Sequence, residues 1–206
     1  MVIGKDFAWA HLPKTGGDAT LSMFRVFIDL VEFADREDSN DKHANFRGRA
    51  QRIRGKLLVM NIRRLPAWVL SRAQHVSRRG TYPDYEPIPM ARANDLADSS
   101  FPDSRLLLHT DEGWFWPDHW LRVETLAADF LDFASDLREV SDSERKRVMA
   151  LGPVNSAEYD HQLARWFTPE QVRRMYVNNP HWATLEQELY GNLYELEDEV
   201  EVRRVS

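Results

Sequence analysis

The first third of the chain alternates short apolar runs with helical patterns. Residues 6–12 (DFAWAHL) predict a strand, after which Gly16 and Gly17 interrupt the pattern and apolar side chains recur with helical spacing as far as Val31. Residues 56–62 (KLLVMNI) predict a second strand. Because this run is short, apolar and bounded by polar neighbours, we expect it inside a parallel sheet that is covered on both faces.

Helices and loops are predicted to fill the rest of the chain. Pro66 suits the first turn of a helix over 66–79, whereas four prolines between residues 80 and 104 predict a long irregular segment. Residues 118–125 predict a strand that leads into a helix. Further expected elements are a polar loop at 35–45, a basic helix at 46–55, two helices with capping boxes at Ser141 with Glu144 and at Thr168 with Gln171, and a last helix that ends at Gly191.

The length and the residue types bound the class of protein. We expect a single α/β domain over residues 1–206, with a central parallel sheet flanked by helices in three layers and an acidic C-terminal tail at about 192–206. The absence of cysteine excludes disulfides, thiolate metal sites and cysteine nucleophiles, and no other residues have convincing metal-ligand spacing. No apolar run approaches the roughly 20 residues of a membrane span, and the N-terminus lacks the features of a signal peptide. The expected protein is therefore soluble and cytoplasmic.

Positive charge is concentrated in one part of an otherwise acidic chain. The formal net charge is −6, yet residues 42–82 contain eleven lysines and arginines and no acidic residue. Such a block predicts either an anionic ligand nearby or a solvated basic helix face. Nucleic acid is not the expected partner, because the net charge would repel it and no recognition module is present.

A glycine loop at residues 11–18 (HLPKTGGD) joins the first predicted strand to the first helix. Two adjacent glycines let the backbone approach a ligand closely, and the N-terminus of the following helix favours an anion. Lys14 adds a full positive charge, and Thr15, Thr20 and Ser22 offer hydroxyl donors. The segment predicts a phosphate-type site, with an ordinary strand-to-helix turn as the alternative. It lacks the Walker A spacing, which argues against an ATPase or a common kinase.

Residues 11–17 (HLPKTGG) resemble the 5′-phosphosulfate loop of carbohydrate-type and bacterial sulfotransferases, whose pattern is H-x-P-K-T-G-G-T-S. The second motif of that family, R-x-P-x-x-R-x-x-S after a strand, resembles residues 63–71 (RRLPAWVLS). The resemblance implies a P-loop-like fold and 3′-phosphoadenosine 5′-phosphosulfate (PAPS) as the donor. It also implies transfer of the sulfuryl group to a hydroxyl or amine of a small-molecule or carbohydrate acceptor, without a metal. The resemblance extends over about residues 7–191 through weaker similarities. These lie at 120–126 with Asp129, at 154–156, at 167–170 and at 190–191.

The same resemblance implies roles for individual side chains. Lys14 would stabilise charge on the leaving phosphate oxygen. His43 would act as the base, because several carbohydrate sulfotransferases have a G-H-x-x-F histidine in this region and His43 with Phe46 looks similar; His75 is the runner-up. The 3′-phosphate would be held by Arg63 and Ser71, which are eight residues apart. The 5′ end of the donor would contact Pro13, Lys14, Thr15, Gly16, Gly17, Asp18, Ala19 and Thr20.

Two parts of the motifs depart from the family pattern. Asp18 and Ala19 replace Thr-Ser, and we expect Asp18 to cap the following helix rather than face a bound anion. In the second motif the proline comes one position late, and Trp68 replaces the usual second arginine. Two alternatives therefore stay open. One is a non-catalytic member of the family that binds a nucleotide or a protein partner, and the other, with less support, is a P-loop kinase that acts on a small molecule.

Overall fold

The chain folds into two compact units, each made of two separate stretches of sequence. Met1–Arg63 and Arg105–Ser156 form the first unit, and Arg64–Ser104 and Ala157–Ser206 form the second. Within the described part no helix is both long and apolar enough to cross a lipid bilayer. The residues that this computed structural model describes are 1–35, 46, 49–78, 90–101, 109–110, 113–114, 116–152 and 158–196.

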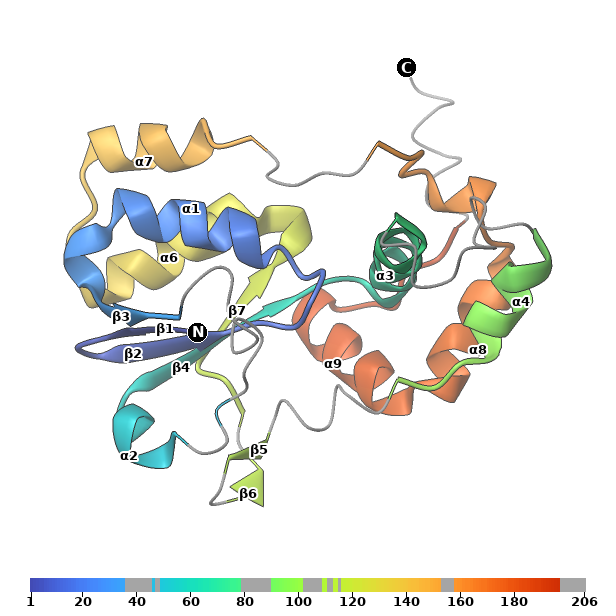
Figure 1. Cartoon of the computed structure of the whole chain (residues 1–206), viewed down its shortest axis with the longest axis horizontal. Helices are drawn as coiled ribbons and strands as arrows, with labels where there is room; N and C mark the ends of the chain where they lie inside the picture. Colours follow the sequence, from blue (N-terminus) through green and yellow to red (C-terminus); the bar gives the residue numbers. More distant parts are fainter. Residues whose placement is uncertain are drawn as a thin grey trace. The chain divides into compact units, whose positions relative to one another are not determined.

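The first unit is built on a five-stranded sheet with the strand order β3-β1-β2-β4-β7 (Figure 1). The three strands β2, β4 and β7 run parallel, whereas β1 pairs antiparallel with both β2 and β3. The sheet is therefore mixed, whereas the sequence predicts a wholly parallel sheet. The reason is that only two residues separate β1 from β2, and a connection that short joins antiparallel strands. The strands are β1 (Val2–Gly4), β2 (Phe7–Ala10), β3 (Val31–Ala34), β4 (Leu57–Ile62) and β7 (His119–Arg122).

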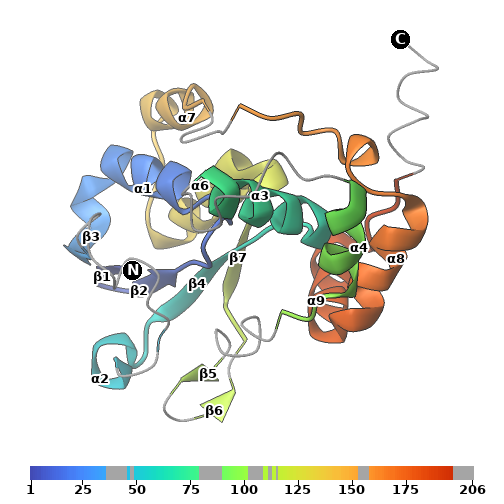
Figure 2. The same cartoon turned by 45° about the vertical axis from the view of Figure 1, so that its right-hand side comes forward.

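Two helices of the first unit pack on one face of this sheet. Figures 1 and 2 show α1 (Gly17–Val26) and α6 (Leu126–Leu137) against it, with α7 (Asp142–Met149) packed outside them. The core between β2, α1 and α6 is rich in aromatic rings, and the ring of Phe24 lies 5.4 Å from that of Phe7 and 5.0 Å from that of Phe130. The shorter elements are η1 (Ile28–Leu30), α2 (Ala50–Ile53), β5 (His109–Thr110), β6 (Gly113–Trp114) and η3 (Val123–Thr125).

The first helix is shorter than the apolar spacing predicts. It ends at Val26, and Phe27 closes it by donating its N–H to the carbonyl oxygen of Phe24. The chain then continues through η1 into β3, so Val31 begins an edge strand and not the last turn of a helix. The strands β1 and β3 escaped prediction because β1 has only three residues and β3 exposes three of its four side chains.

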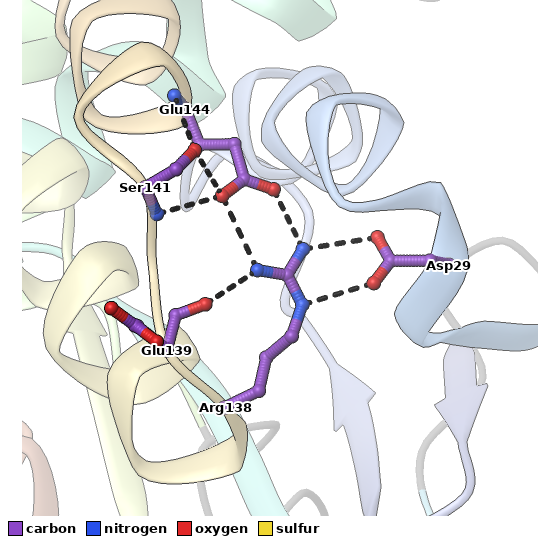
Figure 3. Close-up of polar contacts among 5 residues, drawn as sticks. All are labelled: Asp29, Arg138, Glu139, Ser141 and Glu144. Atoms are coloured by element: carbon purple, nitrogen blue, oxygen red, sulfur yellow. Dashed lines mark hydrogen bonds and ion pairs between the residues drawn. The ribbon is translucent and has the colours of Figure 1, made fainter.

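Arg138 links three elements of the first unit, as Figure 3 shows. Its guanidinium donates to both oxygens of Asp29 (2.9 and 3.1 Å), to both oxygens of Glu144 (2.7 and 3.3 Å) and to the Glu139 carbonyl oxygen (2.7 Å). The hydrogen bonds that Arg138 donates to Glu144, and then those to Asp29, raise the pKa of Arg138 above its usual high value. The same guanidinium, with Ser141, lowers the pKa of Glu144 to about 2. Ser141 and Glu144 also form the predicted capping box of α7, which is confirmed.

We expect Arg138→Gln to destabilise the first unit by about 1 kcal/mol, because it removes a network of charged contacts at a partly exposed position. The Glu144 carboxylate has a lowered pKa, so its contribution is present above its ordinary pKa of 4.5 and is lost as the pH falls through about 2. The difference between wild type and variant should therefore be larger at pH 7 than at pH 3. Urea unfolding at the two pH values measures it, and equal differences would contradict the assignment.

The described part of the second unit is helical. The stretch 80–104, predicted to be irregular, contains the helix α4 (Met90–Asp98), whose flanking prolines all lie outside it. Ala93 and Ala97 are fully buried on this helix, which packs against α8. The capping box at Thr168 and the end of the last helix at Gly191, where φ is 78°, are both confirmed. The other elements are α3 (Leu65–Arg78), η4 (Leu163–Arg165), α8 (Pro169–Asn178) and α9 (Pro180–Tyr190).

Candidate functional site

The predicted phosphate loop connects the carboxyl end of β2 to α1, within the first unit. Lys14 has a φ of 70° and Gly16 a φ of 80°, so two residues of the loop are left-handed. Across the described ranges, Lys14 is the only residue other than glycine with a positive φ. This conformation costs a lysine roughly 1–3 kcal/mol, and such strain clusters at binding and active sites. The strained backbone conformation therefore occurs in the same loop that the sequence motif indicates as a binding site.

Both glycines of the loop are required by their surroundings. A Cβ at Gly17 would lie 2.1 Å from Nε2 of His11, whose buried ring stacks on that of Trp9 with 4.7 Å between centroids. At Gly16 the positive φ would strain any other residue, and a Cβ would also lie 3.3 Å from the side chain of Val123. His11 thus packs against the start of α1, and only glycine at position 17 leaves room for it.

Asn61 of β4 holds the loop from inside the protein. Asn61 is 1% exposed, and its Oδ1 accepts a hydrogen bond from Nε1 of Trp9 at 2.5 Å. Its Nδ2 donates to the carbonyl oxygen of Thr15 and to Oγ1 of Thr20, both at 2.8 Å. Sequence reasoning missed this residue. The signal that marks it is a lone polar side chain in the buried strand LLVMNI.

The hydroxyl groups of the loop are engaged by the backbone. Thr15 donates to the carbonyl oxygen of Leu12 at 2.8 Å, and Thr20 donates to that of Gly16 at 3.2 Å. Ser22, the third hydroxyl named from the sequence, donates to the carbonyl oxygen of Asp18 at 3.1 Å. Each hydroxyl has one proton, and here it is donated to a backbone carbonyl oxygen, so these hydrogen bonds stabilise the conformation of the loop. Contacts from Thr15 and Thr20 to a donor molecule stay a prediction.

Asp18 is the second residue of α1 and not its N-cap. The helix begins at Gly17, its N-cap is Gly16, and no side chain caps it. The expected capping role of Asp18 is therefore wrong, because the left-handed Gly16 starts the helix earlier and accepts its first hydrogen bond, from the Thr20 N–H at 3.0 Å. A carboxylate in the first turn still interacts favourably with the helix dipole. Around it, Ala19 and Lys14 are half-buried and Pro13 is exposed.

Arg63 follows the last residue of β4, at the same edge of the sheet as the loop. The strands β2, β4 and β7 are parallel, so their carboxyl ends meet at this edge. The last residue of β7, Arg122, is held there by Asp129, which accepts from its Nε at 2.9 Å and from its Nη2 at 2.7 Å. Ligands of open α/β sheets bind outside the carboxyl ends of the strands. The chain thus brings Lys14 and Arg63 to the edge where a ligand is expected.

Ser71 lies on α3 in the second unit and is buried. Gln74, one turn later on the same helix face, is also buried, and its Nε2 has no hydrogen-bond partner among the described residues. A buried donor without an acceptor is costly, so this position suits an acceptor such as a phosphate oxygen. Sequence reasoning missed Gln74. Arg63 belongs to the first unit, so its joint contact with Ser71 on one phosphate stays a prediction.

Trp68 stands where the family pattern has its second arginine, and it belongs to the core of the second unit. It is 2% exposed, and its ring centroid lies 4.7 Å from that of Trp182 and 5.0 Å from that of Phe101. The guanidinium of Arg72 lies over the same ring, at 5.2 Å from its centroid. A packing side chain therefore replaces the arginine. His43, the predicted base, lies outside the described residues.

Glu186 of α9 is a fully buried carboxylate at the start of α3. One oxygen accepts from the N–H of Leu65, and the other accepts from the hydroxyl of Tyr176 at 3.0 Å and from Nη1 of Arg64 at 3.3 Å. Burial raises the pKa of Glu186 to about 7, although these donors act in the opposite direction. Burial, and then the nearby carboxylate, also raises the pKa of Tyr176. The turn into the helix that carries Ser71 is thus held by a group that titrates near neutral pH.

Comparison with known proteins gives no relative for this chain. No protein-family model matches it, and neither does any curated protein or solved structure. Among the residues with a described placement, no group of three or more histidine, cysteine or acidic side chains is arranged to hold a metal ion. A proposal for the function therefore rests on three features, which are the loop, its supporting hydrogen bonds and the cations at the sheet edge.

Proposed function

We propose that this protein binds PAPS at residues 13–20 and transfers its sulfuryl group to a hydroxyl or amine of a small-molecule or carbohydrate acceptor. The observation that carries the proposal is the strained loop, in which Lys14 is left-handed just before the N-terminus of α1. A helix N-terminus favours an anion, and a lysine beside it adds a full positive charge. The finer fold we propose is the P-loop-like three-layer arrangement; the three parallel strands and the helices α1 and α6 on one face of the sheet supply two of these layers.

In this proposal each motif residue has a separate task. Lys14 stabilises the charge that develops on the phosphate oxygen as the bond to sulfur breaks. His43 accepts the proton of the acceptor hydroxyl or amine. Arg63 and Ser71 bind the 3′-phosphate, with Arg63 presenting the planar fork that suits phosphate oxygens. Electrostatics and positioning carry this chemistry, so it requires no metal.

Arg63→Ala should abolish a preference for the 3′-phosphate. Wild-type protein is expected to bind adenosine 3′,5′-bisphosphate roughly tenfold to a hundredfold more tightly than adenosine 5′-monophosphate, because a charge-assisted contact contributes about 1.5–3 kcal/mol. Calorimetry with both nucleotides measures this ratio of affinities. Arg147→Ala is the matched control, since it removes the same charge from an exposed position on α7 and should keep the wild-type ratio. Equal affinity of the wild type for both nucleotides would overturn the assignment of Arg63.

A non-catalytic nucleotide-binding protein is the second candidate, and Asp18 favours it. Its carboxylate belongs to the first turn of α1, two residues after the left-handed Gly16, where it opposes the negative charge of a bound donor. Incubation with labelled PAPS and a library of acceptors separates the two candidates, because binding without product would favour the second. Tighter binding of ATP than of adenosine 3′,5′-bisphosphate would instead favour a P-loop kinase.

A further inference from the structure

We propose that Asn61 is a positioning residue of the donor site, which turns the carbonyl groups of the loop inward so that the 5′-phosphate meets N–H groups. This inference rests on the proposed function, because it names a determinant of the same site. A continuous chain of hydrogen bonds carries it, running from β2 through Asn61 on β4 to the N-cap of α1, entirely within the first unit.

The indole of Trp9 sets the direction of this chain. An indole N–H can only donate, so it selects Oδ1 of Asn61 and turns the amide nitrogen toward the loop. That nitrogen has two protons and two acceptors, the carbonyl oxygen of Thr15 and Oγ1 of Thr20. The hydroxyl of Thr20 directs its own proton at the carbonyl oxygen of Gly16. Every group in the chain thus has its donor and acceptor roles decided by Trp9.

The carbonyl oxygens of Thr15 and Gly16 are thereby occupied inside the protein. The oxygen of Thr15 accepts from Asn61 at 2.8 Å, and that of Gly16 accepts from the N–H and the hydroxyl of Thr20 at 3.0 and 3.2 Å. In a planar trans peptide the C=O of one residue and the N–H of the next point in opposite directions. The N–H groups of Gly16 and Gly17 therefore point away from these internal donors. Such N–H groups attract a phosphate, whereas a carbonyl oxygen would repel it.

Asn61→Asp tests the direction of these hydrogen bonds with almost no change of shape. The carboxylate keeps an acceptor for Trp9, but it places an oxygen where the amide nitrogen lies 2.8 Å from the Thr15 carbonyl oxygen. Two acceptors then face each other, and the peptide is expected to turn. Affinity for adenosine 3′,5′-bisphosphate should fall about tenfold or more. Affinity for adenosine 3′-monophosphate, which has no 5′-phosphate, should stay unchanged, and calorimetry with both nucleotides measures the ratio.

Thr20→Val is the second variant, and it decides the question if a buried carboxylate at position 61 prevents folding. Valine keeps the shape of Thr20 but removes the hydroxyl that binds the carbonyl oxygen of Gly16, so the same affinity ratio should fall. Arg138→Gln is the matched control, because it lowers the stability of the first unit without contact to the loop. This control should keep the wild-type ratio of the two nucleotide affinities. A fall of the ratio in the other variants can then be assigned to a displaced loop and not to lower stability.

The outcomes separate this inference from the proposed function. A ratio that falls in the Asn61 and Thr20 variants but not in the Arg138 variant supports the positioning role. A wild-type ratio in folded Asn61→Asp, or in Thr20→Val where the former does not fold, overturns the positioning role and leaves the proposed function standing. A wild-type protein that does not distinguish the two nucleotides overturns both.

Discussion

Lys14→Ala is expected to lower the turnover of sulfuryl transfer by about 10² or more, because it removes the positive charge that stabilises the leaving phosphate oxygen. The fold should change little, since Lys14 is half-buried in a loop and alanine has the same Cβ at the same left-handed φ. Turnover of labelled PAPS with a saturating acceptor measures the effect. Wild-type turnover in the variant would show that Lys14 has no part in the reaction.

Two further substitutions at this position separate charge from backbone strain. Lys14→Arg keeps the charge and should retain more activity than the alanine variant. Lys14→Gly removes the charge but relieves the left-handed strain, so it should be about 1 kcal/mol more stable than Lys14→Ala and equally inactive. Thermal unfolding of the variants tests this order. A glycine variant no more stable than the alanine variant would mean that the left-handed backbone stores no strain.

The second large effect is a loss of stability as the pH rises through about 7, and Glu186 is its cause. Burial raises the pKa of this carboxyl from an ordinary value of 4.5 to about 7. The folded protein binds the extra proton between these values, so the contribution is complete below pH 4.5 and is lost as the pH rises through about 7. The difference corresponds to roughly 3 kcal/mol, or on the order of a hundredfold in the folding equilibrium.

Glu186→Gln isolates this effect, because glutamine has nearly the same shape and does not titrate. The free energy of unfolding is measured with urea at pH 5.5 and pH 8.5 for both proteins. Histidines titrate in the same range, and the comparison between wild type and variant cancels their contribution. The wild type should lose stability relative to the variant as the pH rises. Identical pH dependence of the two proteins would show that Glu186 keeps the same protonation state in the folded and unfolded chain.

Elements with local signals were predictable from the sequence. The runs at 6–12 and 56–62 contain β2 and β4, and both capping boxes join residues three positions apart. The spacing of apolar residues up to Val31 fits one long helix, but it fits a shorter helix followed by an edge strand equally well. The pairing of β3 with β1, which the local sequence does not reveal, selects the second structure. The prolines between 80 and 104 hide α4, which becomes stable by packing against α8.

The candidate site also contains residues that the sequence indicates and residues that it does not. The loop itself is visible in the sequence, because Lys14 and the two glycines are contiguous signals. Asn61, which holds the loop, is not, because it reaches Thr15 across 46 positions. Glu186, which holds the start of α3 in the other unit, reaches Leu65 across 121 positions. Likewise, nothing near Trp68 in the sequence indicates that it packs on Trp182. Long-range contacts decide whether a motif position binds a ligand or fills a core.

The interleaving of the two units sets the order in which the chain can fold as it leaves the ribosome. Translation delivers β2 and β4 first, then α3 and α4 of the other unit, and only afterwards β7 and α6. The phosphate loop therefore emerges long before Val123 and Leu126, the side chains that pack beside Gly16. A nascent chain that stops at Ser104 would contain both sequence motifs and yet complete neither unit.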